Sequence, residues 1–277
     1  MNTTLSQDQI NHFQENGFVI QENFLDENEL EIWRNAVSEA VKVRNGIKIP
    51  GREIKAEDED GSNEDPEYFS NVFDQLLNLW QTNNKIKKIM LDERIGKMAS
   101  ELSGVDGIRI WHDQALIKEP WGNPTGWHLD NPKWSYNSKN TLTIWIALDD
   151  ATISNGCMYF IPGSHKMVEQ AFYDKNDGGP INQNIGDLFR IYPNLSNLNS
   201  VAAPMKAGSC SFHNGLLAHG AGSNMTPLWR RAMTCGFMPD GSTFNGKQNV
   251  LPDSYFNSLR IGDTLNNEKI NPLIYKK

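Results

Sequence analysis

The spacing of apolar residues changes near residue 105, and this change constrains the fold more than any other feature of the chain. Before it, apolar side chains recur every three or four residues, which is typical of amphipathic helices. After it, short runs rich in β-branched and aromatic residues alternate with turn signals, which indicates strands. The sequence therefore predicts a mainly helical N-terminal part, residues 1–102, that buttresses a β-rich core, residues 103–240.

The helical part contains clear start and stop signals. Ser6 and Gln9 form a capping-box pattern, and Gly17 gives the first short helix a glycine stop. A first strand is expected at 17–20, and Asp26 caps a second helix over about 30–41. Apolar residues from 69 to 98 continue at helical spacing, so we expect helix to about residue 102.

The β-rich part indicates a sandwich or a jelly-roll barrel, because several short strands follow one another with turns between them. The expected strands are 107–111, 115–117, 141–148, 157–161, 209–212 and 232–238. Residues 166–206 interrupt this rhythm, and a connection of that length is usually a lid or a binding loop. With a C-terminal tail over 241–277, we expect one catalytic domain over residues 1–277, with specificity residing in the insertion and the tail.

Composition excludes several classes of protein. No apolar run approaches the roughly 20 residues of a membrane span. The net charge is −8 without a basic stripe, which argues against nucleic-acid binding. The acidic run 57–65 is expected to be a solvated loop. An anionic ligand gains little from this average charge, although a local pocket can still be basic, and no basic cluster suited to coenzyme A phosphates is visible. Three widely spaced cysteines predict no disulfide framework and no zinc site, and they favour a reducing cytoplasm.

One constellation of residues is suited to metal chemistry. His128 and Asp130 are separated by one residue, so on a strand both side chains point to the same side. Two histidines and one carboxylate are the usual ligands of a non-haem Fe(II) oxygenase, and His219, which follows an apolar run, is the candidate second histidine. The spacing of His128 and Asp130 alone is equally available to a solvent-facing ion pair. Arg230 could pair with the carboxylate of a co-substrate, with Arg231 as its competitor.

The ordered set of motifs resembles the phytanoyl-CoA dioxygenase family of Fe(II)/2-oxoglutarate-dependent oxygenases. The segments that carry the resemblance are 13–19, 127–130, 145–150, 155–158, 161–166 and 219–231. It implies a double-stranded β-helix, the cupin-like jelly-roll barrel, with an N-terminal helical buttress. It also implies that a small organic substrate is hydroxylated or otherwise oxidised while 2-oxoglutarate and O2 become succinate and CO2.

The resemblance assigns residues as well. His128, Asp130 and His219 match the iron ligands, and Arg230 matches the residue that binds the distal carboxylate of 2-oxoglutarate. Further walls of the co-substrate pocket are expected at Gln114 and Trp145. One position departs from the pattern, because relatives often carry a serine that helps to bind 2-oxoglutarate where this chain has Ala221. The carboxylate of Asp130 argues against halogenation, since related halogenases have a small residue there.

Other readings stay open at this stage. A non-catalytic cupin-like protein could bind metal or ligand without turnover, and a cupin-type isomerase or hydrolase would not need Arg230. His165 is expected to be structural, whereas a site role or a structural one is open for His112 and His213, and His12 is given no role. Three tryptophans could either line the pocket or pack in the barrel. Two residues that follow Asp130 could either contact the substrate or lie on the surface. These are Trp111, Trp127, Trp134, Asn131 and Lys133.

Overall fold

The computed structural model describes all residues except 45–46, 53–70, 170–177 and 180–183. The acidic run 57–65 therefore lies outside the described residues. The helices are α1 (Gln7–Asn16), α2 (Glu27–Arg44), α4 (Leu79–Thr82), α5 (Asn84–Met90), α6 (Glu93–Ser103), α8 (Leu188–Ile191) and α9 (Asp253–Phe256). The strands are β1 (Phe18–Gln21), β2 (Asp74–Leu77), β3 (Gly107–Lys118), β4 (Thr125–His128), β5 (Leu142–Ala147), β6 (Met158–Phe160), β7 (Val201–Ala203), β8 (Cys210–Asn214), β9 (His219–Ala221), β10 (Arg230–Pro239) and β11 (Leu273–Lys276).

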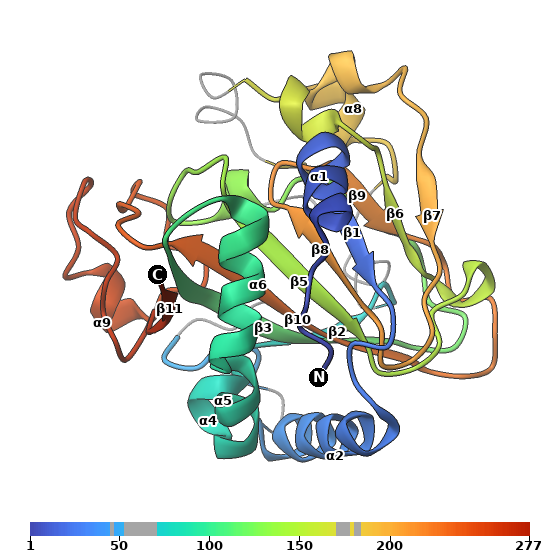
Figure 1. The fold of residues 1–277 in the computed structure, drawn as a ribbon, viewed down its shortest axis with the longest axis horizontal. Helices are drawn as coiled ribbons and strands as arrows, with labels where there is room; N and C mark the ends of the chain where they lie inside the picture. The colour runs from blue at the N-terminus through green and yellow to red at the C-terminus, as the bar shows by residue number, and fades with distance from the viewer. Residues whose placement is uncertain (45–46, 53–70, 170–177, 180–183) are drawn as a thin grey trace.

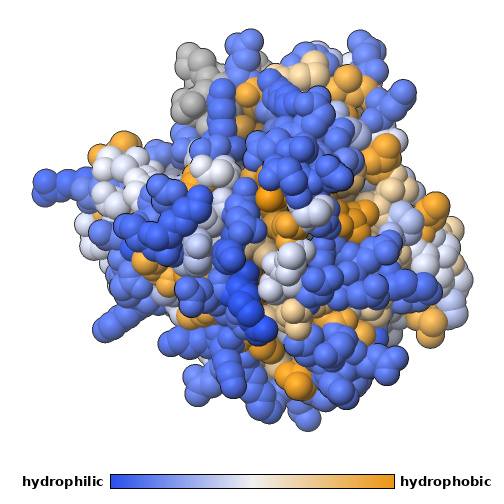
Figure 2. All heavy atoms as spheres, in the orientation of Figure 1, coloured by the Kyte–Doolittle hydropathy of each residue, from blue (hydrophilic) through white to orange (hydrophobic). Residues whose placement is uncertain are grey.

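Two antiparallel sheets form the β part of the molecule. The larger one, the major sheet, has the order β1-β8-β5-β10-β3-β11, with β2 also paired to β3. The minor sheet has the order β4-β9-β6-β7. Helices cover one face of the major sheet: α6 crosses in front of it, with α2, α4 and α5 together at its lower end (Figure 1). The outward surfaces of α1 and α2 are largely hydrophilic (Figure 2). This arrangement confirms the predicted jelly-roll class with a helical buttress.

The central strands β5, β8 and β10 of the major sheet are buried on both faces over almost their whole length. On β5, Ile144 and Ile146 pack into the core beneath the helices, whereas Trp145 and Ala147 belong to a second cluster between the two sheets. The same alternation on β10 sends Met233 toward the helices. Alternate side chains of one strand therefore point to opposite faces of the sheet. One set packs against the helices, and the other set faces the minor sheet and can line a cavity.

The helical part largely follows its predicted boundaries. Ser6 and Gln9 make both hydrogen bonds of the capping box, and Gly17 ends α1 with a positive φ of 81°. Asp26 accepts a hydrogen bond from the backbone N–H of Glu29 at the start of α2. The expectation of continuous helix from residue 69 is wrong, because β2 pairs with β3 and only α4, α5 and α6 follow it. Leucines in β2 serve a strand as well as a helix, so their spacing could not discriminate.

The structure differs from the sequence-based expectations in three further places: the insertion, the tail and the first strand of the β-rich part. Within the expected insertion 166–206, α8 and β7 are ordered elements, and β7 pairs with β6 in the minor sheet. The expected tail contributes β11, which pairs with the first residues of β3. The two strands expected at 107–111 and 115–117 are one long strand, β3.

None of the described helices is both long and apolar enough to cross a membrane.

Candidate active site

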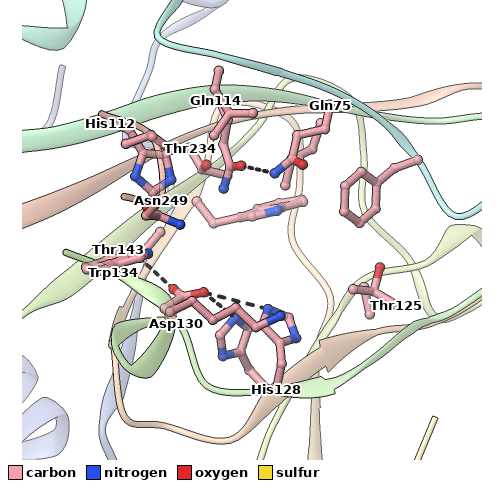
Figure 3. Close-up of a pocket in the computed structure, with 18 of the residues that line it drawn as sticks. Gln75, His112, Gln114, Thr125, His128, Asp130, Trp134, Thr143, Thr234 and Asn249 are labelled. Atoms are coloured by element: carbon pink, nitrogen blue, oxygen red, sulfur yellow. Dashed lines mark hydrogen bonds and ion pairs between the residues drawn. The ribbon is translucent and has the colours of Figure 1, made fainter. Parts of the chain in front are cut away.

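A cavity of about 850 Å³ lies between the two sheets. Its walls come from β2, β3, β5, β8 and β10 of the major sheet, from β4, β6 and β9 of the minor sheet, and from the segments 48–52, 130–134 and 247–250. The cavity therefore receives side chains that are far apart in sequence. In the close-up, His128 and Asp130 lie on one side, with Gln75, Gln114, His112 and Thr234 facing them across the space (Figure 3).

The candidate metal ligands meet on one wall of this cavity. His128 ends β4 and His219 begins β9, and the two residues are directly opposite each other in the antiparallel pair. The Nε2 atoms of His128 and His219 lie 3.7 Å and 3.6 Å from the same oxygen, Oδ1 of Asp130. All three ligand atoms lie within 4.8 Å of one another, which places them around a point that one ion can occupy.

Asp130 reaches this position by a route that differs from the predicted one. Strand β4 stops at His128, and Asp130 has helical backbone angles, φ −74° and ψ −55°, just before a short 3-10 helix over Asn131–Lys133. Alternation along a strand therefore does not bring Asp130 beside His128. A turn after the strand does so, and the spacing rule predicted the right neighbours from the wrong local geometry.

Backbone carbonyls fix the orientation of both imidazoles. The Nδ1 atom of His128 lies 2.8 Å from the carbonyl oxygen of Gly126, and Nδ1 of His219 lies 2.9 Å from that of Leu217. A carbonyl oxygen can only accept, so each Nδ1 carries the hydrogen and donates it. Each Nε2 then has a free lone pair facing the cavity, which is the arrangement of metal-binding histidines.

Two further residues contact the carboxylate of Asp130. Thr143 on β5 donates a hydrogen bond from its hydroxyl to Oδ2 of Asp130 over 2.9 Å. His213 on β8 places Nε2 3.4 Å from the same oxygen. Sequence reasoning missed Thr143, although a threonine within an otherwise apolar strand was a usable signal. It left His213 open, and the structure puts it in the cavity wall, buried beside the candidate ligands.

The charge states of the three groups suit a cation. Burial lowers the pKa of His128 to about 4 and that of His219 well below its ordinary value, so both imidazoles are neutral at pH 7. Burial raises the pKa of Asp130, but the surrounding imidazoles, His219 first, outweigh it and hold that pKa well below its usual range. Two neutral nitrogen donors and one carboxylate, with open positions toward the cavity, fit a non-haem iron ion.

Arg230 is a buried cation that lines the same cavity as the candidate metal ligands. Its side chain is 2% exposed, and its guanidinium carbon lies 5.3 Å from the centre of the Trp145 ring. Within the described part of the chain, Nε and Nη1 of Arg230 have no hydrogen-bond partner. Burial lowers the pKa of Arg230 to about 10, so the group is still charged at pH 7. A buried cation with two unused donors is suited to a carboxylate ligand.

The competitor of Arg230 is occupied elsewhere. Arg231 points to the opposite face of β10 and donates to Asp149 from Nε and Nη2, over 2.8 Å and 2.7 Å. Gln114 lines the cavity and accepts a hydrogen bond from Gln75. Trp145 also lines it, beneath Arg230. All six residues singled out from the sequence thus belong to one cavity.

Most of the residues left open can now be placed. His112, Trp134 and Lys133 line the cavity, whereas Asn131 is buried and donates to the carbonyl of Tyr136. Trp111 packs in a cluster with Trp134, and Trp127 packs on Phe189 away from the cavity. His165 lies against Gly17, as expected of a structural residue, and His12 contacts Phe18. The cysteines are Cys157, Cys210 and Cys235, all free and buried.

The described residues of the expected lid, 166–206, lie outside the cavity walls. Instead, Gly178 and Ile185 accept hydrogen bonds from the backbone N–H groups of Leu129 and Trp127, so this segment supports the chain that carries His128. The C-terminal segment 247–250 does line the cavity, as expected of the tail, and so does the segment 48–52, which sequence reasoning did not single out.

Comparison with known proteins agrees with the geometry. The family model for phytanoyl-CoA dioxygenase (PhyH) matches residues 13–232. A phytanoyl-CoA dioxygenase domain-containing protein 1 homolog from Caenorhabditis briggsae is 26% identical, over 88% of this chain and 94% of its own length. The peroxisomal phytanoyl-CoA dioxygenase of Mus musculus is 26% identical, over 85% and 69%.

A solved structure extends the comparison to three dimensions. The non-heme alpha-ketoglutarate-dependent carbocyclase SnoK from nogalamycin biosynthesis superposes with a TM-score of 0.76 at 28% identity, covering 98% of this chain and 96% of its own. The match of the family model spans most of the chain and contains the whole candidate site. The chain therefore belongs to the phytanoyl-CoA dioxygenase family.

Proposed function

We propose that this protein is an Fe(II)/2-oxoglutarate-dependent dioxygenase that hydroxylates or otherwise oxidises a small organic molecule in the cavity between its sheets. The observation that carries the proposal is the meeting of His128, Asp130 and His219 in the same cavity as the unpaired guanidinium of Arg230. Metal ligands alone would serve many chemistries. A buried cation across from them adds the means to hold a carboxylate-bearing co-substrate.

In this proposal the protein supplies position and the cofactors supply reactivity. Nε2 of His128, Nε2 of His219 and the carboxylate of Asp130 would hold the iron. When iron and 2-oxoglutarate are bound, they activate O2, and 2-oxoglutarate becomes succinate and CO2 while the substrate is oxidised. Thr143 holds the carboxylate of Asp130 in place through its hydroxyl, and the Gly126 and Leu217 carbonyls hold the two rings.

The major-sheet wall would bind the co-substrate. Arg230 would bind the distal carboxylate of 2-oxoglutarate through charge-assisted hydrogen bonds, and the Trp145 ring lies against the guanidinium. Gln114 would contribute a polar contact on the same wall, with its amide already oriented by Gln75. Ala221, where relatives often carry serine, lines the cavity without a donor.

We also propose that residues 1–277 form one catalytic domain that acts in the cytoplasm. A single core cluster joins α1, α2, α5 and α6 to the major sheet, and β11 ties the C-terminal end of the chain to the same sheet. Cys157, Cys210 and Cys235 are free and buried, which suits a reducing compartment. A peroxisomal location is named for the mouse relative. Fractionation with an antibody against the natural protein would test the location.

The decisive experiment measures succinate. Protein loaded with Fe(II) is given 2-oxoglutarate, air and a panel of metabolites, and succinate and CO2 are quantified with and without O2. We expect O2-dependent succinate that rises with the right substrate, and no succinate from the His128→Ala variant. Metal and 2-oxoglutarate binding without any succinate would instead favour a non-catalytic binder. A product formed without 2-oxoglutarate, and unaffected by Arg230→Ala, would favour a cupin-type isomerase or hydrolase.

A further inference from the structure

The cavity is far more basic than the protein that contains it. The chain has a net charge of −8, with 26 basic and 34 acidic residues. Among the described residues that line the cavity, the cations are Lys48, Arg52, Lys133, Arg230 and Lys247, and the only carboxylate is that of Asp130. A local positive potential inside an acidic protein raises the local concentration of anions and selects for them. The average composition concealed this feature.

Arg230 and the segment that carries Lys133 lie at different ends of the cavity. Gly236 on β10 packs against Trp134, since a Cβ atom at Gly236 would lie 3.0 Å from that indole ring. Arg230 lies six residues before Gly236 on the same strand, about 20 Å away at ~3.3 Å per residue. Trp134 directly follows Lys133. In the close-up, Trp134 and Asn249 lie on one side of the candidate ligands and Thr125 on the other (Figure 3).

Lys133 and Lys247 form a group near Trp134. Lys133 ends the 3-10 helix that follows Asp130, and Lys247 donates from Nζ to the carbonyl of Pro132 in that helix. Within the described ranges, neither ammonium forms an ion pair with a carboxylate of the protein. Lys48 and Arg52 have other partners, and nothing below depends on them.

The charges of the proposed cofactors and their protein ligands can be summed to show whether any negative charge is left to pair with Lys133 and Lys247. If the proposed function holds, iron carries +2, Asp130 −1, 2-oxoglutarate −2 and Arg230 +1, so the inner site sums to zero. The cofactors therefore leave the charges of Lys133 and Lys247 uncompensated. Both lysines are partly exposed, so water compensates part of their charge, and an anionic group bound at this end of the cavity would gain the attraction of two neighbouring ammonium groups. Ile49, Leu77, Trp134 and Val250 line the cavity as well and offer an apolar surface.

We propose that the substrate is an anion, a carboxylate or a phosphate on an apolar body, whose charged group is bound by Lys133 and Lys247. This inference rests on the proposed function and names its substrate class. Lysine ammonium groups are point charges rather than planar forks, so they accept either a carboxylate or a phosphate. The apolar part of the substrate would lie against Trp134 and Val250, which directs a carbon atom toward His128 and Asp130.

Binding can be tested without turnover. Protein loaded with Zn(II) and saturated with 2-oxoglutarate, so that Arg230 is occupied, is titrated with three probes while saturation-transfer NMR follows binding. The probes are 3-phenylpropionate, phenyl phosphate and the neutral 3-phenylpropionamide. We expect both anions to bind at least about tenfold more tightly than the amide, and the tighter of the two identifies the charged group. An amide that binds as tightly as the anions would overturn the proposal.

Variants locate the anion. Lys133→Met and Lys247→Met should each weaken binding of the tighter anion by about tenfold, which corresponds to roughly 1.4 kcal/mol. Binding of the amide should not change, and this shows that each variant is folded. Lys139→Met is the matched control, because Lys139 lies on the same connection but outside the cavity walls, and it should change neither affinity. Anion binding that survives both cavity substitutions would refute the assignment.

Succinate assays separate this inference from the proposed function. If a panel of metabolites yields coupled succinate only with neutral compounds, the enzyme activity stands and the anionic substrate class is wrong. If the anions bind through Lys133 and Lys247 but no compound gives succinate, the anion site stands and the proposed function is wrong. Coupled succinate from anionic compounds, with KM raised about tenfold by Lys133→Met, would support both.

Discussion

Replacing Arg230 with methionine should affect co-substrate binding and protein stability in opposite directions. The guanidinium is 2% exposed, and two of its nitrogen atoms have no hydrogen-bond partner among the described residues. Methionine has a similar length and no charge, so it fills the space without the electrostatic demand. Removing a residue that stabilises the fold lowers the stability of the protein. Removing a residue that serves only to bind a ligand weakens ligand binding and does not lower stability.

The structure gives both magnitudes. Two charge-assisted hydrogen bonds to a carboxylate are worth ~1.5–3 kcal/mol each, so Arg230→Met should raise the KM for 2-oxoglutarate by roughly 10²–10⁴-fold. Burial lowers the pKa of Arg230 from 12.5 to about 10, which corresponds to at most about 3 kcal/mol of cost for the charged form. Recovering about 1 kcal/mol of this would raise the melting temperature of the ligand-free protein by roughly 2–4 °C.

Two assays and one control decide the matter. Succinate release against 2-oxoglutarate concentration gives KM, and differential scanning calorimetry with and without 2-oxoglutarate gives the stability of each variant. Arg231→Met is the control, because that guanidinium already pairs with Asp149. It should cost about 1 kcal/mol of stability and leave KM unchanged. An Arg230→Met protein that melts lower and keeps its KM would show that Arg230 is structural, and the reasoning would fail.

Three further substitutions test other parts of the site and fold. Thr143→Val removes the hydroxyl that donates to Asp130 and should weaken Co(II) binding about 10–100-fold in a spectroscopic titration, whereas Thr141→Val, which loses bonds to other groups, should leave it unchanged. Ala221→Ser adds a donor to the cavity wall and should lower the KM for 2-oxoglutarate about threefold or more; an increase would show that serine does not fit. Burial lowers the pKa of Lys118 from 10.5 to about 6, so the folded protein binds fewer protons than the unfolded chain between these values. Stability should therefore rise with pH by at most about 4 kcal/mol between pH 6 and 9, and urea unfolding of Lys118→Met should lose that slope.

The sequence allowed prediction of the elements whose signals are local. The capping box at Ser6, the glycine stop at Gly17 and the apolar strand 142–147 each depend on residues within a few positions of one another. Strand β2 was misread because two leucines in four residues match both periods. Its strand character comes from pairing with β3, about 40 residues later in the chain, and no local signal reports such a partner.

The candidate site divides in the same way. His128, Asp130, His219 and Arg230 were predicted together because each belongs to a motif with a chemical meaning. Thr143 was not, because its role depends on the distance from β5 to the turn after β4. Lys133 was a possible substrate contact from the sequence, but its proximity to Lys247 was not predicted, since the two residues are 114 positions apart and Lys247 reaches this segment through its contact with Pro132. Sequence motifs identify individual ligand residues, whereas the electrostatic potential inside the cavity depends on which charged side chains the fold brings together.

The pairing of His128 with His219 across β4 and β9 makes the site sensitive to chain length as well as to residue type. The register is irregular between Thr125 and His128, where three steps along β4 match two along β9, so deleting a residue there would change both the position of His128 relative to His219 and the side to which its imidazole points. Such a protein could keep its folded shape and yet have only one histidine available for iron. Single-residue deletions in β4 should thus abolish iron binding while leaving circular dichroism unchanged, a separation that substitutions at buried positions rarely achieve.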